Sequence, residues 1–308
     1  MKNYLHQYFS NWEIPSFNEI IENSRFFKNH INNDYLSRFN EFKNNVIVIT
    51  GASSGIGRSM AIEFSKRGAK VVLASRNTEK LEEVGYIINK EGGESLIIAT
   101  DVSKERQCKL LIKKTINAFG KIDILINNAG ISMRANFQEV RLDVLKKLMD
   151  INFWGSVYCT KYALPYLTES KGSIVGVSSI CGITPLPGRT GYAASKHALD
   201  GFLETIRVEN IEKGLHVLIV HPGFTTSNIR NTALNQFGIP QIETPKDESK
   251  LMPAERVAKE IADAIFHKKR EITLTTEGRL ITWLYKRAPN LADRLIFNEM
   301  KKEVGAPF

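Results

Sequence analysis

Val46-Ile-Val-Ile-Thr-Gly-Ala-Ser-Ser-Gly-Ile-Gly57 joins an apolar run to a glycine-rich turn, and a helical pattern over Arg58–Arg67 follows at once. A short run of Val and Ile is typical of a buried strand. Strand, glycine turn and helix in that order form an anion site, because glycine allows a tight turn and the helix start presents free N–H groups. The stretch therefore predicts a β-strand followed by a pyrophosphate-binding turn.

The glycine spacing of this turn, GxxxGxG, differs from the general GxGxxG dinucleotide fingerprint, so that broader match does not apply. A glycine-rich turn alone is also consistent with a flexible hairpin or a helix cap, and the rest of the chain must decide between them. The residues of the turn predicted to bind the ligand are Gly51, Ser53, Ser54, Gly55, Ile56 and Gly57.

Further apolar runs recur along the chain, with room for a helix between them. This alternation predicts βαβ units, and near-continuous Val, Ile and Leu content indicates a sheet covered on both faces. We therefore predict an α/β fold: a doubly wound Rossmann-type parallel sheet of about seven strands, with helices on both faces. Ligands of such sheets bind at the carboxyl ends of the strands, where the strand order reverses. The predicted strands are residues 46–49, 70–73, 95–98, 122–126, 173–177 and 216–220, with 272–275 as a candidate seventh.

The second predicted strand ends in Ala74-Ser75-Arg76, which bears on the choice of dinucleotide. An NAD site would have a carboxylate here to bind the adenosine 2′-hydroxyl. A guanidinium instead attracts a 2′-phosphate, and its planar fork suits phosphate oxygens. Ser75 and Arg76, with Arg58 as a further candidate, therefore predict NADP(H); the alternative is that Arg76 is only a solvated loop charge.

Two more strand ends carry candidate cofactor contacts. Asp101, beside Val102, is placed to accept a hydrogen bond from the adenine amino group, or else it caps a helix that begins near Ser103. The turn Asn127–Gly130 supplies small residues, including Asn128, Ala129 and Gly130, where cofactor and backbone would meet closely. Its alternative interpretation is an ordinary Asn/Gly turn.

Three polar residues form a candidate catalytic group. Ser179 follows the fifth predicted strand, and Tyr192 and Lys196 lie four positions apart, hence on one face of a helix. A tyrosine hydroxyl can donate a proton to the oxygen of a reduced carbonyl, and a nearby ammonium would lower its pKa from about 10. Ser179 would hydrogen-bond the substrate oxygen. The Tyr-x-x-x-Lys spacing alone also fits an ordinary amphipathic helix, so the inference depends on the joint pattern.

Residues 45–230 together resemble the short-chain dehydrogenase/reductase family. The family motifs TGxxxGxG, NNAG and YxxxK are intact at Thr50–Gly57, Asn127–Gly130 and Tyr192–Lys196. The resemblance covers about three fifths of the chain. It implies a seven-stranded Rossmann sheet, usually in dimers or tetramers, and an enzyme that transfers a hydride between nicotinamide and an alcohol or carbonyl, with Tyr192 as general acid/base.

The resemblance also assigns individual residues. The family's active-site serine lies thirteen positions before the tyrosine, which selects Ser179 over Ser178. Its asparagine corresponds to Asn152, which would hold a water that continues a proton relay through Lys196. In the Pro-Gly segment after the sixth strand, the residues expected to contact the nicotinamide end are Pro222, Gly223 and Thr225, while Ser227 replaces a threonine found in many relatives.

The chain is expected to have three parts: an aromatic-rich helical extension over 1–44, the Rossmann-fold domain over 45–275 with a substrate lid at 224–252, and amphipathic helices over 276–308. Residues 1–44 hold ten of the 28 aromatic side chains, too many for a solvated linker, and a helix should open near Ser16. The C-terminal helices, broken at Pro289, either pack on the lid and a partner subunit, which we favour, or lie in a membrane interface.

Composition narrows the partners. The formal net charge is +9, but no run of five like charges occurs, so a nucleic-acid partner is not expected. Three scattered cysteines indicate neither a disulfide framework nor a metal site, and a reducing cytoplasm fits best. No apolar run is long enough to span a bilayer, so membrane contact should be peripheral at most. We expect a homodimer or homotetramer that acts on a small-molecule alcohol or carbonyl.

The substrate itself is not identified by these motifs. A partly apolar pocket is expected from Met133, Ile180, Cys181 and Leu186, while Arg134 and Arg189 either attract an acidic group or face solvent. Because a fold does not dictate function, a catalytically idle NADP(H)-binding sensor or scaffold remains the alternative to an enzyme.

Overall fold

A computed structural model of the chain describes residues 40–242 and 251–308. The extension predicted over 1–44, with its helix near Ser16, lies outside the described residues except for its last five positions. These form a turn that leads directly into the first strand.

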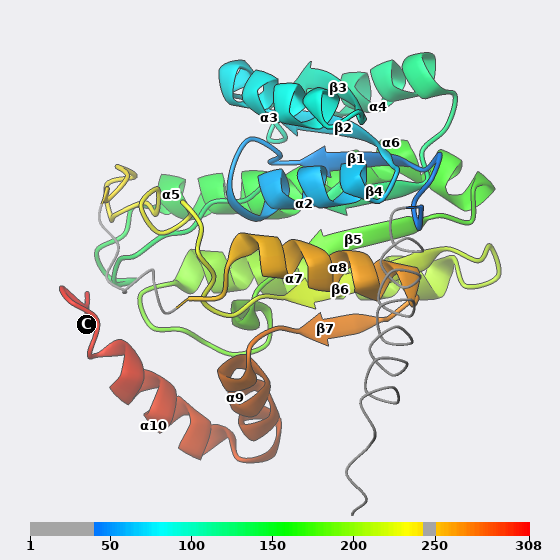
Figure 1. Ribbon diagram of the computed structural model, residues 1–308. Coiled ribbons are helices and arrows are strands. Elements are labelled where there is room, and N and C mark those ends of the chain that lie inside the picture. Colours follow the sequence, from blue (N-terminus) through cyan, green and yellow to red (C-terminus); the bar gives the residue numbers. More distant parts are fainter. Residues whose placement is uncertain (1–39, 243–250) are drawn as a thin grey trace, which may run out of the picture. The chain divides into compact units, whose positions relative to one another are not determined.

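Seven parallel strands form one sheet, in the spatial order β3-β2-β1-β4-β5-β6-β7 (Figure 1). This confirms the predicted fold class and all seven strands, although β4 begins two residues later than expected. The strands are β1 Val46–Thr50, β2 Lys70–Ser75, β3 Glu94–Ala99, β4 Ile124–Asn127, β5 Ser173–Val177, β6 His216–His221 and β7 Glu271–Thr273.

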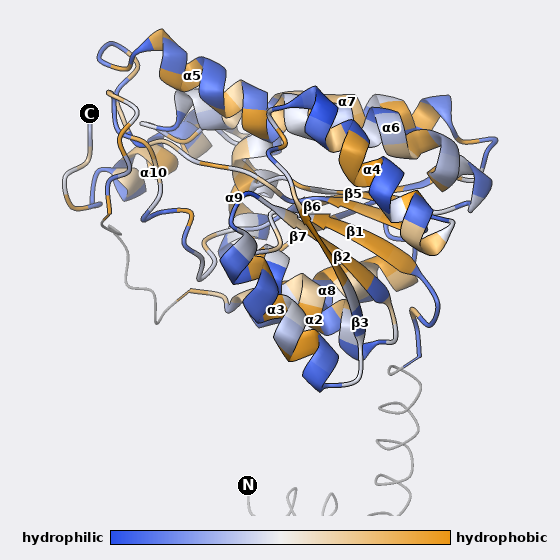
Figure 2. Ribbon diagram, turned by 90° about the horizontal axis from the view of Figure 1, so that it is seen from above, coloured by the Kyte–Doolittle hydropathy of each residue, from blue (hydrophilic) through white to orange (hydrophobic). Residues whose placement is uncertain are grey.

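Helices cover both faces of the sheet (Figure 2). Alternate residues of β1 explain why: Ile47 and Ile49 belong to the apolar core on one face, and Val46 and Val48 to the core on the other. A strand buried on both sides has no polar alternation, as the sequence predicted. One layer consists of α2 Gly55–Lys66, α3 Thr78–Lys90 and α8 Ala254–Phe266, and the other of α4 Glu105–Phe119, α5 Leu142–Met149, α6 Gly155–Glu169 and α7 Thr190–Glu209.

The strand order reverses between β1 and β4, which are hydrogen-bonded neighbours although β2 and β3 separate them in the chain. The loops at the carboxyl ends of these two strands leave in opposite directions, to α2 on one face and toward α5 on the other. A crevice opens at such a point because no crossover connection covers it. The site should therefore lie beside the ends of β1 and β4.

Two helices follow β7 at the edge of the sheet, α9 Thr276–Arg287 and α10 Pro289–Met300 (Figure 1). Pro289 separates them as predicted, since it occupies the first turn of α10, where its missing N–H costs nothing. Among the described residues, no helix is long and apolar enough to cross a bilayer.

The burial predicted for these two helices is only partly found. Ile296 is 7% exposed, but the exposed fractions of Leu280, Trp283, Leu291 and Leu295 lie between 47% and 63%. The described chain thus leaves more than half of Leu280, Trp283 and Leu291 uncovered. Their packing against a partner subunit therefore stays a prediction.

Candidate active site

The glycine-rich turn connects β1 to α2 and is held against the end of β4. Thr50 Oγ1 accepts hydrogen bonds from the backbone N–H groups of Asn128 and Ala129, at 3.0 and 3.1 Å. The Asn128 side chain donates in return to the Thr50 carbonyl oxygen, at 2.8 Å. These bonds hold together the two strand ends that border the crevice. Thr50 and Asn128 therefore have a structural role in their motifs.

Gly51 and Gly57 are required by this close approach. Gly51 has a φ of +69°, and a Cβ at Gly57 would lie 2.2 Å from the Gly51 carbonyl oxygen. Ser54 precedes α2 without a side-chain capping bond, so the N–H groups of the first helical turn remain available to an anion. The turn thus has the small cross-section and the positive helix end that a pyrophosphate group needs.

A cleft of about 550 Å³ runs from this turn across the ends of β1, β4 and β5. The lining residues extend from the glycine-rich turn to α7, which leaves room for an extended dinucleotide. It is lined by every residue predicted to bind the cofactor: Gly51, Ser53, Ser54, Gly55, Ile56, Gly57, Ser75, Arg76, Asp101, Val102, Asn128, Ala129, Gly130, Tyr192, Lys196, Pro222, Gly223 and Thr225.

The adenine end of the cleft is bounded by the ends of β2 and β3. Arg76 is exposed and lines the cleft beside Ser75, whereas Arg58 is not among the lining residues. The Asp101 carboxylate accepts hydrogen bonds from the backbone and hydroxyl of Ser103, at 3.0 and 2.8 Å. The helix expected near Ser103 begins at Glu105, so Asp101 closes a turn ahead of it and does not cap it.

The three candidate catalytic side chains meet at the other end of the cleft. Ser179 begins a short 3₁₀ turn after β5, and its Oγ accepts from the Cys181 backbone N–H at 3.1 Å and lies near enough to Tyr192 to act on the pKa of that phenol. Lys196, one turn after Tyr192 on α7, donates to the Val177 carbonyl oxygen at 2.8 Å. Its Nζ lies 5.7 Å from the centre of the Tyr192 ring. The structure therefore brings together the residues that the sequence proposed.

Burial controls the ionisation of this group. It raises the pKa of Tyr192 above the ordinary 10, although Ser179 acts in the opposite direction. It lowers the pKa of Lys196 to about 8, with Asp200 opposing. The lowering of the Tyr192 pKa that we expected from Lys196 is not found: loss of solvation has the largest effect, and what lowering there is comes from Ser179 and Arg189.

Asn152 occupies a π-helical turn, Asp150–Trp154, and is fully buried. Its Oδ1 accepts from the Ile131 N–H at 2.8 Å, and its Nδ2 donates to the Ile131 carbonyl and to Ser195 Oγ, both at 2.9 Å. Ser195 precedes Lys196 on α7. Asn152 therefore joins the loop after β4 to the catalytic helix, and it does not line the cleft; its water-holding role stays a prediction.

Sequence reasoning missed part of the lining. The segment after Pro222-Gly223 contributes four consecutive residues from Ser227 to Arg230, and only Ser227 had been singled out. These side chains belong to the predicted lid, for which no motif exists. The other lining residues not predicted are Asn77, Thr100, Ile131, Ile151, Val177, Ser178 and Thr232.

A second, largely apolar cavity of about 670 Å³ adjoins the cleft and shares Gly223 with it. Of the pocket residues expected from the sequence, Ile180 and Leu186 line this cavity, whereas Met133 and Cys181 are buried beside it and do not. Residues from Leu251 onward supply most of its lining. These are Leu251, Met252, Thr275, Glu277, Gly278, Ile281, Leu295, Ile296, Glu299 and Met300.

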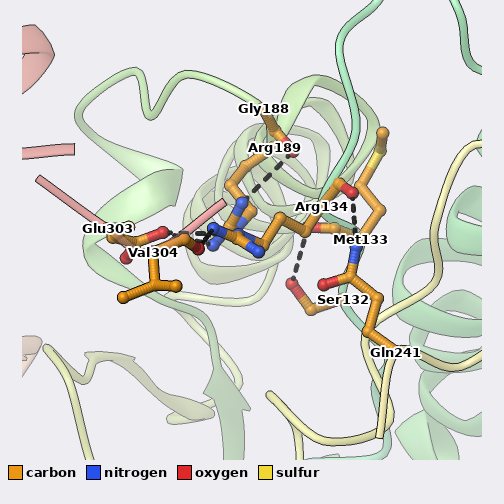
Figure 3. Close-up of polar contacts among 8 residues, drawn as sticks. All are labelled: Ser132, Met133, Arg134, Gly188, Arg189, Gln241, Glu303 and Val304. Atoms are coloured by element: carbon orange, nitrogen blue, oxygen red, sulfur yellow. Dashed lines mark hydrogen bonds and ion pairs between the residues drawn. The ribbon is translucent and has the colours of Figure 1, made fainter. Parts of the chain in front are cut away.

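Arg134 and Arg189 do not face solvent, and the acidic group that they attract belongs to the chain itself. Each side chain is only 12% exposed, and both form ion pairs with Glu303 from the C-terminal tail (Figure 3). The sequence could not show this pairing, because Glu303 follows Arg189 by 114 positions.

Among residues 40–242 and 251–308, no three His, Cys, Asp or Glu side chains are grouped to hold a metal ion. His221, at the end of β6, lies instead between two carboxylates. Its Nε2 is 2.9 Å from Asp200 and its Nδ1 is 3.3 Å from Glu271. Burial acts to lower the pKa of His221, but the two carboxylates outweigh it and raise the pKa to about 8.

Residues 45–236 match the family model described as short chain dehydrogenase. The chain belongs to the short-chain dehydrogenase family. Its motifs, sheet order and cleft are thus those of an established oxidoreductase family, and the resemblance noted in the sequence is confirmed.

Relatives of this short-chain dehydrogenase are also named as dehydrogenases. "11-beta-hydroxysteroid dehydrogenase-like 2" of Arabidopsis thaliana is 44% identical over 193 residues, which span 62% of this chain and 62% of that protein. "Dehydrogenase/reductase SDR family member 7B" of Mus musculus is 34% identical over 267 residues, or 85% of this chain and 83% of the mouse protein.

Solved structures share the fold of this short-chain dehydrogenase. A family member from Burkholderia phymatum in complex with NAD gives a TM-score of 0.73 at 24% identity, over 82% of this chain and 96% of its own. An alcohol dehydrogenase from Thermococcus sibiricus complexed with 5-hydroxy-NADP gives 0.67 at 23% identity, over 75% and 95%. The two titles name different dinucleotides, so they do not decide between NAD and NADP.

Proposed function

We propose that this short-chain dehydrogenase transfers a hydride between NADP(H) and an alcohol or carbonyl carbon of an apolar small molecule. One observation carries the proposal: Ser179, Tyr192 and Lys196 line a cleft of about 550 Å³ that adjoins an apolar cavity at Gly223, and Ile180, next to Ser179 in the chain, lines that cavity. A substrate carbonyl entering from that cavity would meet the polar group at the junction. The nicotinamide, when bound, supplies or accepts the hydride.

Each of the three side chains has a role that follows from its position. Tyr192 Oη gives its proton to the substrate oxygen during reduction and takes it back during oxidation. Ser179, which lines the cleft together with Tyr192, binds that same oxygen. The Lys196 ammonium, held by the Val177 carbonyl, stabilises negative charge on Tyr192 while the proton is away.

The preference for NADP(H) is supported by the end of β2. No carboxylate stands among Ala74, Ser75 and Arg76, and the last two line the cleft at its adenine end. An exposed guanidinium in this place attracts a 2′-phosphate, whereas a carboxylate would repel it. Cofactor binding by residues Gly51–Gly57 is supported by two features of the turn. There is no space for a Cβ atom at Gly57, and the N–H groups at the start of α2 have no side-chain cap.

The assembly and location proposed for the enzyme are a homodimer or homotetramer in the cytoplasm. Support for assembly comes from three apolar side chains of α9 and α10 that are each more than half exposed, Leu280, Trp283 and Leu291. Peripheral contact with a membrane is the other use of such a face, since basic side chains flank it.

A cofactor and substrate screen tests the proposal. The purified protein should oxidise NADPH faster than NADH with at least one member of a set of keto-acyl, steroid, retinoid and aromatic carbonyls. Replacing both Ser75 and Arg76 by Asp should reverse the cofactor preference, because two carboxylates repel the 2′-phosphate. Tighter binding of NADH by the unmodified protein contradicts the NADP(H) assignment. Cofactor binding without turnover of any carbonyl favours an idle sensor.

A further inference from the structure

The tail that follows α10 is attached to the loops around the substrate cavity by a buried carboxylate. The Glu303 side chain is 4% exposed. Its Oε2 lies 3.2 Å from Arg189 Nη2 and 3.6 Å from Arg134 Nε (Figure 3). One acid from the tail thus faces two arginines that come from different loops.

Arg134 connects this ion pair to the lid. Its backbone N–H donates to the Leu234 carbonyl at 2.8 Å, and its carbonyl accepts from Gln241 Nε2, also at 2.8 Å. Its guanidinium donates to the Val304 carbonyl oxygen of the tail. The segment of the lid up to residue 242 and the C-terminal tail are therefore held by the same residue.

Arg189 connects the ion pair to the catalytic helix. It is the N-cap residue of α7, three positions before Tyr192. Gly188 beside it accepts a hydrogen bond from the Ala135 N–H at 3.0 Å, and the Pro307 ring packs against it, 2.9 Å from where a Cβ would be. Burial lowers the pKa of Arg189 and Glu303 opposes that effect, so the carboxylate favours the charged guanidinium.

α10 brings this junction to the substrate. Ile296 and Met300 line the apolar cavity, and Glu303 follows Met300 by less than one helical turn. Thr184 and Leu186, from the loop that ends at Arg189, line the same cavity. Displacement of Glu303 would therefore separate two walls of the cavity while leaving the cofactor cleft, on the far side of Gly223, in place.

We infer that Glu303 is a positioning residue that sets the shape of the substrate cavity by clasping the tail and α10 to Arg134 and Arg189. The inference rests on the proposed function only in that the apolar cavity is taken as the substrate site. Removing one acid leaves two buried guanidiniums without their counter-charge, which drives the three segments apart.

The test compares Glu303→Gln, which keeps shape but not charge, with Asp293→Asn, which removes an exposed acid from the same C-terminal segment. For Glu303→Gln we expect KM for an apolar carbonyl to rise about tenfold or more, with kcat changed less than about threefold and NADPH affinity unchanged. Hydrogen exchange should accelerate in residues 131–141 and 224–242 but not in 50–57. Asp293→Asn should match the unmodified enzyme in all four measurements.

Two results would overturn the inference: unchanged KM and exchange in Glu303→Gln, or a parallel loss of kcat, KM and cofactor affinity. If Glu303→Gln does not fold, Glu303→Asp replaces it. This variant keeps the negative charge on a side chain that is shorter by one methylene, so we expect a smaller rise in KM and in hydrogen exchange. Unchanged KM and unchanged exchange in Glu303→Asp would refute the clasp. If no carbonyl is turned over at all, the proposed function fails, and the exchange pattern still decides on the clasp.

Discussion

The phenol of Tyr192 is the residue on which turnover should depend most. We expect Tyr192→Phe to lower kcat by about 10²–10⁴-fold, because the change removes only the proton donor. NADPH affinity should remain, since the ring that lines the cleft is kept. Fluorescence titration of NADPH and initial rates, measured on the same preparation, separate the two effects. A variant that keeps more than about a tenth of the rate would remove Tyr192 from its proposed role.

Ser178 and Ser179 offer an internal comparison for this prediction. Both line the cleft, but of the two only Ser179 acts on the pKa of Tyr192, which it lowers. Ser179→Ala should therefore lower kcat about a hundredfold or more, as the loss of an oxyanion donor does, and Ser178→Ala should cost much less. The reverse order would exchange their roles.

At the scale of an element, the β1–turn–α2 unit depends on a glycine that has no room for a side chain. A Cβ at Gly57 would lie 2.2 Å from Gly51 O and 2.6 Å from Asn128 Nδ2. We expect Gly57→Ala to destabilise the protein by about 1–3 kcal/mol and to weaken NADPH binding strongly. Thermal unfolding and cofactor titration measure these losses.

Gly201 provides the matched control. It is exposed within α7, and a Cβ there would meet nothing within 4 Å, so Gly201→Ala should stabilise the protein by about 0.5–1 kcal/mol. If the two alanine variants behave alike, the close approach of Gly57 to Gly51 does not limit the turn.

The ion pairs of His221 join β6 to α7 and β7 and make stability depend on pH. The pKa of His221 is raised from 6.5 to about 8 in the folded protein. Protonation thus favours folding: the contribution, about 2 kcal/mol, is fully present below pH 6.5 and is lost as pH rises through 8. His221→Gln should remove this decline, measured as the free energy of unfolding at pH 6 and pH 8.5.

The exposed His267 allows a control for that comparison. His267→Gln should keep the decline of the unmodified protein between the two pH values. A decline of equal size in His221→Gln would show that other groups cause it. Lys196, whose pKa is lowered to about 8, acts in the opposite direction, since stability from its neutral form grows only above that pH.

The five inner strands were predictable because each is a short apolar run buried on both faces, whereas the edge strands β3 and β7 are partly exposed. The catalytic and glycine motifs were predictable because their residues lie within a few positions of one another. Contacts such as Glu303 with Arg189 were not, because a single acid among 33 carries no sign of its distant partner. The pKa of Tyr192 was misjudged for a related reason: its neighbours were known, but not its burial.

At the scale of the whole molecule, α9 and α10 line the apolar cavity proposed for the substrate without contributing to the sheet. We expect truncation after Thr275 to raise KM for an apolar substrate, because Ile281, Ile296 and Met300 line the cavity. Cofactor affinity should change by less than about threefold. Light scattering should also show a smaller assembly, if the exposed Trp283 face is the subunit contact.

Vesicle binding tests the alternative use of the exposed Trp283 face, contact with a membrane. The intact enzyme should not co-sediment with anionic vesicles at physiological salt, because acidic residues among the basic ones weaken attraction to such a surface. Tight vesicle binding, together with unchanged kinetics and assembly after truncation, would assign α9 and α10 to a membrane interface.

The position of β1 between β2 and β4 has a consequence for folding during synthesis on the ribosome. The Val46 N–H donates to Asp123 Oδ2 at 2.7 Å across a separation of 77 positions. At a synthesis rate of about 5–20 residues per second, one edge of β1 waits roughly 4–15 s for its partner. An unpaired edge on so apolar a strand is a template for pairing with a neighbouring nascent chain. Chaperone protection of β1 during those seconds should therefore limit such mispairing.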